Sequence, residues 1–418
     1  MSDTVRVLTL NCWGLKYVSR RRRERLRAIA DALAASPYDV IGLQEIWVES
    51  EDWVYTRDLC ADAFPHATFF LTGAFGGGLG ILSRYPIVDT STHMYSLTGT
   101  PVYVAEGDWI AGKACGCATL QHPTLGLVDV WNTHLTAVGG QVGPETRRAY
   151  RVVEALELAY RCRASAERGR HVVCVGDLNS LQDSLCLRIL TSIGGLRDSM
   201  DAVGAKAAHM DTVTCDAPAN TWTAGKTLDH VARMHAGKRL DYILFRGPAS
   251  GEQRLRCVAH RVVFTDLAPG LGVSYSDHFG VAATLVAAAS GARDPGSSAY
   301  ARASASDTDS VLGEVVPVLH SALVTARSQQ RTHLGMFAAA LALVGCLVVG
   351  NVCASAWLMH GRSVPASLIT AVMLVPATWV GTTALYSGYV WGEWQKRSLR
   401  CALNRVEVLR TAARHITP

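Results

Sequence analysis

Polar residues follow several strand-like segments, and their types are those of hydrolytic chemistry. Residues 172–180 read VVCVGDLNS, an apolar run that passes directly into Gly-Asp-Leu-Asn. Other apolar runs in the chain also end in an acid, an amide or an imidazole. The side chains collected in this way are Asn11, Glu45, His134, Asp177, Asn179, Asp241, Asp277 and His278.

Each of these residues alone has an ordinary structural explanation. An Asn or Asp after a strand is commonly a turn former, and a single His is commonly a hydrogen-bonding residue. Together they predict more, because the ends of adjacent strands meet on one rim of a sheet, where functional loops gather. Carboxylate and amide oxygens suit a hard cation, and an imidazole suits proton transfer near neutral pH. The pattern therefore predicts a metal-assisted hydrolytic site on that rim.

The intervening segments predict the scaffold. Apolar runs that end in polar clusters are typical of strands buried on both faces. Helical periodicity is found over residues 20–36, where Ser19 is the expected N-cap, and over residues 144–165. We expect an α/β fold with layered sheets and strands over residues 5–11, 38–45, 78–84, 126–134, 171–179, 239–245 and 280–287.

Composition limits the function classes. The chain has 418 residues and a formal net charge of +5, so charge alone indicates no strong nucleic-acid surface. Its 12 cysteines form no C-x-x-C pair. The N-terminus lacks a basic segment followed by an apolar core, so we expect no secretory signal and reduced thiols facing the cytosol.

Two long uncharged runs near the C-terminus predict a transmembrane hairpin. Residues 334–359 and 366–391 are each long enough to span a bilayer, and only HGRSVP separates them. Arginines and lysines flank the outer ends, which by the positive-inside rule places residues 1–288 and the tail in the cytosol. The alternative is a buried helix pair in a soluble domain, which the absence of an amphipathic polar stripe disfavours.

These signals divide the chain into five parts. We expect a catalytic domain over 1–288, a Gly/Ser-rich linker over 289–310 and a juxtamembrane helix over 311–333. Two transmembrane helices over 334–391 and a basic cytosolic tail over 392–418 follow. The tail either lies on an anionic membrane or is a solvated helix.

Six motifs in this order resemble the deoxyribonuclease-like endonuclease/exonuclease/phosphatase superfamily: LNCWG (10–14), LQEIW (43–47), NTHL (132–135), GDLNS (176–180), RLDYILF (239–245) and SDHFG (276–280). The resemblance covers the first 288 residues. It implies a four-layered α/β sandwich of two packed sheets. It also implies cleavage of phosphate esters with a divalent metal.

Two further segments narrow the resemblance. FGGGLGILSRYPI (75–87) and AEGDWIAGK (105–113) look like the neutral sphingomyelinases, and most of all like the fungal inositol phosphosphingolipid phospholipases C. This implies a membrane-anchored phosphodiesterase that converts sphingophospholipid into ceramide and a phosphorylated headgroup. In the resembled family the second segment is implicated in activation by anionic phospholipid, which would make Lys113 an anchor for that lipid and Trp109 an interfacial residue.

Two details of the motifs limit the resemblance. GDWIAGK also satisfies the spacing of a nucleotide P-loop, but Ala114 stands where Ser or Thr would bind magnesium, so nucleotide binding is disfavoured. The resembled enzymes commonly continue THLHA, whereas this chain has Thr136 in place of the second histidine. That departure concerns contacts to the headgroup and not the reaction itself.

Given a phosphodiester substrate, chemical roles follow for the rim residues. Mg²⁺ would neutralise charge on the phosphoryl oxygens, with Glu45 as its main ligand, Asn11 beside it and Asp277 completing the set. His278 is the expected general base. Either Asp241 or Asp177 orients it, and we favour Asp241, with Asp177 positioning the attacking water. Asn179 and His134 would donate hydrogen bonds to the phosphoryl oxygens.

Other functions remain as alternatives. A nuclease on the same fold would want a basic surface for DNA, and a transmembrane hairpin makes that awkward. An inositol-polyphosphate phosphatase is a further possibility, as is a catalytically silent membrane scaffold, which would not need the full set of polar residues. The membrane expected for the phosphodiesterase is that of the endoplasmic reticulum or mitochondrion, and no nucleic-acid partner is expected.

Overall fold

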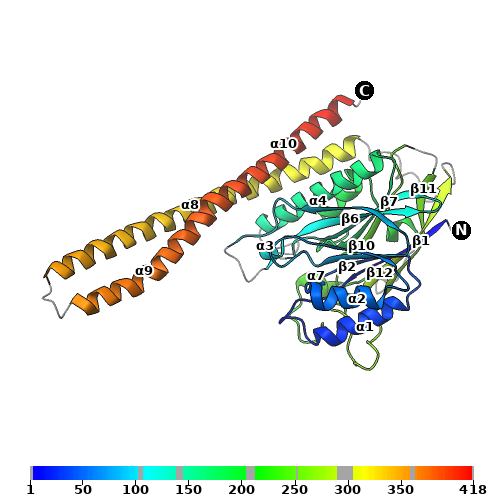
Figure 1. Ribbon diagram of the computed structural model, residues 1–418. Helices are drawn as coiled ribbons and strands as arrows, with labels where there is room; N and C mark the ends of the chain where they lie inside the picture. The colour runs from blue at the N-terminus through cyan, green and yellow to red at the C-terminus, as the bar shows by residue number, and fades with distance from the viewer. Residues whose placement is uncertain are drawn as a thin grey trace.

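The protein was analysed as a computed structural model. The structure describes residues 3–101, 107–137, 145–203, 212–250, 253–289, 305–357 and 363–416. Most of the predicted linker and the HGR part of the turn between the apolar runs lie outside these residues. Figure 1 shows a layered domain from which a long pair of helices projects to one side.

Two mixed sheets face each other. The first contains, in spatial order, β11 (Gln253–Val263), β12 (Gly280–Ala289), β1 (Thr4–Asn11), β2 (Val40–Gln44), β4 (Leu79–Ser83) and β3 (His66–Phe70). The second contains β5 (Ile87–Met94), β6 (Ala114–His122), β7 (Gly126–His134), β8 (His171–Asp177), β10 (Asp241–Arg246) and β9 (Arg197–Asp198). The interior between them is built from aliphatic and aromatic residues such as Val7, Val175 and Ile243.

Helices cover the outer faces of both sheets. The helices of the domain are α1 (Arg22–Ala34), α2 (Val54–Leu59), α3 (Asp108–Ala111), α4 (Glu145–Glu167), α5 (Leu185–Ser192), α6 (Ser199–Ala202) and α7 (His230–Met234), with a π-helical turn over Glu49–Trp53. Helix α1 packs on the first sheet through Leu26, Ile29 and Leu33. Helices α4 and α5 pack on the second sheet. The predicted four-layered α/β sandwich is therefore confirmed.

The start of α1 differs from our expectation. Its N-cap is Arg21, which adopts a left-handed conformation with φ of 48°, and not Ser19. Residues 15–19 instead form a turn in which the Ser19 backbone N–H donates to the Leu15 carbonyl. The Ser19 hydroxyl therefore lies before the helix and does not cap it.

The C-terminal part forms three long helices. Helix α8 (Ala305–Trp357) runs out from the domain, α9 (Ser363–Leu385) returns, and α10 (Gly392–Ile416) continues the return beyond a π-helical turn over Tyr386–Trp391. Residues 307–357 and 367–414 contain stretches long and apolar enough to cross a membrane, and those stretches are almost entirely unburied. Two apolar helices that could form a hairpin are thus present.

The ends of α8 and α10 nearest the domain pack against it. Leu312, Val315 and Leu319 of α8 join the same buried cluster as residues of α4 and α5. Leu403 and Val406 of α10 belong to that cluster as well. One face of the basic tail is therefore buried on the protein, which neither of our two expectations for the tail included.

Candidate active site

Strand alternation explains how the site residues come together. Successive side chains of a strand point to opposite faces, so residues two apart share a face. In β8, Val173 and Val175 face the interior between the sheets, and Asp177 is the next residue on that face. In β10, Ile243 and Phe245 face the same interior, which places Asp241 there too.

The register of the strands aligns these residues at one end of the sandwich. Asp177 pairs across the ladder with Asp241 on one side and with His134 on the other. On the opposing sheet, Asn11 ends β1, beside Gln44 at the end of β2. The interior of the sandwich therefore changes from apolar to polar toward the ends of β1, β2, β7 and β8.

A buried amide layer lies just beneath the site. The Gln44 side-chain N–H donates to Asn132 Oδ1 at 2.7 Å, which links one sheet to the other. Asn132 in turn donates to the backbone carbonyls of Leu43 and Gly80, both at 2.9 Å. Because both amides are fully buried and paired, this layer fixes the separation of the sheets below the catalytic groups.

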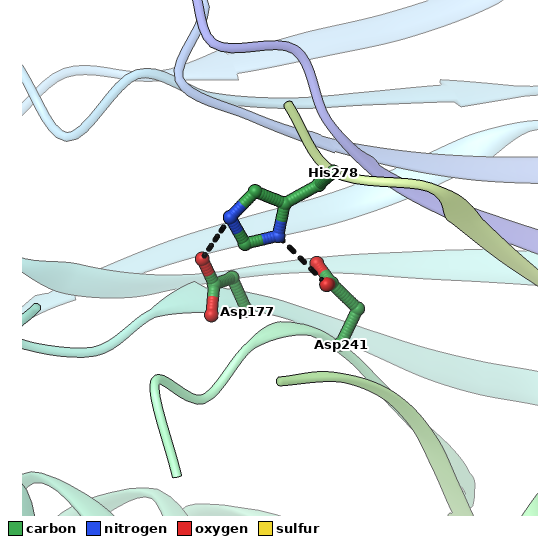
Figure 2. Close-up of side chains that lie close together, drawn as sticks. All are labelled: Asp177, Asp241 and His278. Atoms are coloured by element: carbon green, nitrogen blue, oxygen red, sulfur yellow. Dashed lines mark hydrogen bonds and ion pairs between the residues drawn. The ribbon is translucent and has the colours of Figure 1, made fainter. Parts of the chain in front are cut away.

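His278 lies between two buried carboxylates (Figure 2). Its Nδ1 is 2.8 Å from Asp241 Oδ2, and its Nε2 is 3.9 Å from Asp177 Oδ2. Burial alone would lower the pKa of His278, but the charges of Cys215, Asp241 and Asp177 outweigh it and raise that pKa well above the ordinary value. The side chains of Asp177, Asp241 and His278 could also hold a metal ion together.

A second group of oxygen atoms lies beside this trio. Glu45 Oε1 and Asp177 Oδ2 both accept from Asn11 Nδ2, each at 3.0 Å. His134 Nε2 is 3.6 Å from Asp177 Oδ2 and 3.9 Å from Glu45 Oε1. Burial, together with the charges of Lys113 and His278, lowers the pKa of His134, so its imidazole is neutral.

The buried carboxyl groups of Asp177 and Asp241 lie close together. Burial and the charge of Asp241 raise the pKa of Asp177 to about 7. One oxygen of Asp241, Oδ1, is buried and has no hydrogen-bond partner. A buried Asp177 carboxyl group that resists ionisation, with amide and carboxylate oxygens close around it, fits a hard divalent cation.

Two residues of the site have unusual backbones. Glu45 has φ of +58° and Asn179 has φ of +45°. Asn tolerates this left-handed region, whereas Glu rarely adopts it. The Glu45 backbone is held there by neighbouring chain, since its carbonyl accepts from Gly14 N–H at 2.9 Å. Such conformations cluster at functional sites, where surrounding structure enforces them.

The remaining predicted residues lie at different positions. Asn179 is close to the site. Its backbone N–H donates to Asp177 Oδ1 at 2.8 Å, and its side-chain N–H donates to the Leu135 carbonyl at 2.9 Å. Asp277 forms an ion pair with Lys226 at 3.2 Å. Among the described residues, no hydrogen bond or ion pair joins Asp277 to Glu45 or Asn11.

Lys113 is placed differently from a surface anchor. Its side chain is only 2% exposed, and its Nζ lies 3.5 Å from Asp108 Oδ1 in the turn that begins α3. Trp109 is half-buried against the helical core. The role of Lys113 toward an anionic lipid stays a prediction, and residues 105 and 106 of its motif lie outside the described residues.

The structure also reveals partners that we did not predict. The Thr136 hydroxyl donates to Glu154 Oε1 at 2.6 Å, and its backbone N–H donates to Glu154 Oε2 at 2.9 Å. Glu154 thereby ties α4 to the segment that follows His134. The helical periodicity of residues 144–165 predicts which positions are buried. It does not predict that Glu154 at one of these positions accepts hydrogen bonds from Thr136.

Comparison with known proteins agrees with this geometry. Residues 8–278 match the model of the endonuclease/exonuclease/phosphatase family. An inositol phosphosphingolipids phospholipase C of Schizosaccharomyces pombe is 32% identical over 94% of this chain and 92% of its own length. Sphingomyelin phosphodiesterase 2 of Rattus norvegicus is 31% identical over 79% of this chain and 72% of its own length.

Solved structures share the fold. The crystal structure of SmcL superposes with a TM-score of 0.52 at 18% identity, covering 68% of this chain and 99% of that one. A beta toxin variant from Staphylococcus aureus with bound magnesium ions gives 0.50 at 17% identity, covering 67% and 98%. The chain therefore belongs to the endonuclease/exonuclease/phosphatase family, in the branch that contains the inositol phosphosphingolipid phospholipases C and the sphingomyelin phosphodiesterases, and it is a phosphoric diester hydrolase.

Proposed function

We propose that this chain is a membrane-anchored, Mg²⁺-dependent phospholipase C that acts on sphingophospholipids. It would hydrolyse sphingomyelin or an inositol phosphosphingolipid to ceramide and a phosphorylated headgroup. The observation that carries the proposal is the convergence of His278, Asp241 and Asp177 with Glu45 and Asn11 at one end of the sandwich. The names of the relatives supply the substrate class.

His278 is the proposed general base. With Asp241 accepting the proton of Nδ1, the Nε2 atom is left free to accept a proton from water. Water adds to phosphorus, its proton passes to His278 Nε2, and the bond between phosphorus and the ceramide oxygen breaks. The leaving ceramide oxygen takes a proton from solvent water, and His278 returns its extra proton to solvent. Asp177 is proposed to orient the water, and its Oδ2 atom, 3.9 Å from His278 Nε2, supports that role.

Glu45, Asn11 and Asp177 are the residues proposed to hold Mg²⁺, with Asp277 as a further candidate. When bound, Mg²⁺ supplies positive charge that stabilises the phosphoryl oxygens in the transition state. A structural relative carries bound magnesium, which favours this ion over others. Asn179 and His134 are proposed as hydrogen-bond donors to the phosphoryl oxygens, since each amide nitrogen has two protons and the neutral imidazole has one.

We also propose a topology. Residues 1–288 form the catalytic unit, 289–310 a linker, 311–333 a juxtamembrane helix, 334–391 the membrane hairpin and 392–418 a basic tail. The exposed apolar stretches of the helix pair support the hairpin, and the cationic flanks favour a catalytic domain on the cytosolic side. The membrane of the endoplasmic reticulum or mitochondrion is our expectation for the location.

One assay tests the proposal. The detergent-solubilised full chain is given magnesium or chelator and supplied with sphingomyelin, inositol phosphoceramide, soluble inositol polyphosphate or plasmid DNA. We expect magnesium-dependent cleavage of a sphingolipid, with a loss of about 10²-fold or more in His278→Ala. The matched control is His320→Ala, an exposed histidine of α8. Cleavage of DNA or of inositol polyphosphate, with none of lipid, would favour the alternative functions.

A further inference from the structure

The catalytic end of the sandwich adjoins the base of the apolar hairpin. Glu154, which binds Thr136 just beyond the end of β7, lies one turn along α4 from Tyr150. The Tyr150 hydroxyl accepts from Gln395 Nε2 at 2.8 Å. Gln395 follows the last residue of the apolar hairpin, Trp391, by four positions. The strand ends that carry the site therefore lie next to the point where the hairpin leaves the domain.

A second contact also places the base of the hairpin at the catalytic end of the sandwich. The Trp394 indole N–H donates to the Ser96 carbonyl at 2.8 Å. Ser96 follows β5, whose last residue, Met94, pairs with Ala114 at the start of β6. Because β6 is antiparallel to β7, that start lies at the catalytic end. Figure 1 shows the same arrangement, with α3 on the side of the domain from which the helix pair projects.

Large apolar side chains are exposed at this end. Strands β1 and β7 end at the catalytic end of the sandwich. Because β3 and β11 run parallel to β1, and β5 runs parallel to β7, these three strands end there as well. The loops that follow β1, β3 and β11, the last residue of β5 and helix α7 before β10 carry Leu15, Tyr17, Val18, Leu71, Phe75, Met94, Met234 and Leu267, all exposed. Tyr17 is 95% exposed and Phe75 67% exposed, so they are not core residues at the edge of the fold.

The rest of the sandwich domain carries fewer such side chains. In its described part, the exposed large hydrophobic residues elsewhere are Tyr55 and Leu59 of α2, Val88 at the start of β5 and Val258 within β11. Scattered apolar residues are ordinary on a protein surface, but a group of eight gathered at one end marks an interaction site. The loops are also anchored, since the backbone N–H groups of Ala74 and Phe75 both donate to the Ile110 carbonyl of α3.

We propose that the exposed residues of these loops form a membrane-contact face that lies on the lipid bilayer around the mouth of the active site. We define this face by Leu15, Tyr17, Val18, Leu71 and Phe75, with Met94, Met234 and Leu267 at its margin. The occupant is the bilayer and not another protein, because the face lies at the end of the domain that adjoins the base of the apolar hairpin. Tyrosine at the boundary between water and hydrocarbon suits such a contact.

The inference rests on the proposed membrane anchor and deepens it. An anchor alone confines the enzyme to the membrane but does not bring its site into contact with lipid. Apolar loops around the site would make that contact, with the ends of β1, β7 and β8 directed toward the headgroups. The bond to be cut lies at that depth, so the substrate need not leave the bilayer completely.

Depth-dependent fluorescence quenching tests the face in the full chain. The exposed cysteines Cys346, Cys353 and Cys401 are replaced by serine, while the buried cysteines are left in place. A bimane probe is then placed at Phe75→Cys, at Val88→Cys as the matched control, or at Val348→Cys in the apolar hairpin. The protein is reconstituted in phosphatidylcholine vesicles with or without brominated phosphatidylcholine. We expect at least twofold quenching at positions 75 and 348 and little at position 88.

Each outcome has one meaning. Quenching at position 348, with position 75 no more quenched than position 88, rejects the membrane-contact face but leaves the anchor standing. No quenching at position 348 rejects the anchor and this face with it. A disulfide-linked dimer formed by the unlabelled Phe75→Cys protein, with no quenching in the labelled protein, would mean that a second copy covers the face, and this too overturns the proposal. None of these readouts depends on sphingolipid cleavage.

Discussion

Asp241→Asn tests how the site activates its base. Asp241 is fully buried, and its Oδ2 lies 2.8 Å from His278 Nδ1. In the proposed mechanism the carboxylate fixes the tautomer that leaves Nε2 free and stabilises the imidazolium that would form when Nε2 takes a proton. An asparagine is nearly the same size but is uncharged, and its amide N–H can donate to Nδ1. That contact favours the tautomer with the proton on Nε2, which cannot accept another.

The size of the effect follows from the distance. Two unit charges about 4 Å apart interact by about 4 kcal/mol at an effective dielectric constant of about 20. A barrier higher by that amount lowers the rate by about 10³-fold. This lies within the range of about 10² to 10⁴ for general acid–base catalysis. We therefore expect kcat to fall by about 10³-fold, with a smaller change in KM.

The assay is steady-state hydrolysis of sphingolipid in mixed micelles, followed across pH. Because the Asp241 charge raises the pKa of His278, its loss should also move the acidic limb of the kcat profile to lower pH. Asp89→Asn is the control, since Asp89 is exposed near the far end of β5. A variant that keeps more than about a tenth of wild-type kcat, with normal folding by circular dichroism, would refute the role assigned to this pair.

Three further changes probe the surroundings. Glu45→Gln keeps the shape of a proposed metal ligand but removes its charge, so half-maximal activity should need at least about tenfold more magnesium, and an unchanged titration would contradict the assignment. Lys113→Met should lower the free energy of unfolding, measured by urea denaturation, by about 3–5 kcal/mol, because Asp108 would be left as a buried unpaired charge. Adding Asp108→Asn to this variant should restore part of the loss. Burial raises the pKa of Glu154 from its ordinary value of 4.5 to about 7, so its contribution to stability is complete below about pH 4.5 and is lost as pH rises through about 7. Glu154→Gln should therefore remove that fall in the thermal midpoint between pH 5 and 8, and a midpoint with the same pH dependence as wild type would count against it.

The rim of polar residues could be predicted from sequence because period-2 alternation and strand ends are local properties. Asp177 and Asp241 each continue an inward-facing row of apolar residues, so their common position follows once both strands are recognised. The choice between them as partner of His278 is not local. It depends on antiparallel register between β8 and β10, which sets Asp241 against Nδ1 and Asp177 against Nε2.

Some elements carried too little local signal. Strand β5, IVDTSTHM, is mostly exposed and polar, and β6, ACGCATLQH, is rich in small residues, so neither shows the apolar run that marked the other strands. The burial of Lys113 was equally hidden. Its motif is indistinguishable by composition from a surface loop, whereas in the fold Gly73 approaches Ala111 and Gly112 closely and the Lys113 side chain is 2% exposed.

The way α8 and α10 pack changes what the hairpin does for the domain. A Gly/Ser-rich linker before α8 suggests a loose tether, which would raise local concentration but leave orientation free. Yet Leu312, Val315 and Leu319 are buried against α4 and α5, and full burial of one such side chain is worth about 1.5–3 kcal/mol. Glu314 also forms an ion pair with Arg188 of α5, and Asp309 joins α8 to Arg410 of α10. Helices held in this way would transmit the direction of the hairpin to the sandwich, so under the proposed topology the anchor would set the angle at which the catalytic end meets the bilayer as well as its distance from it.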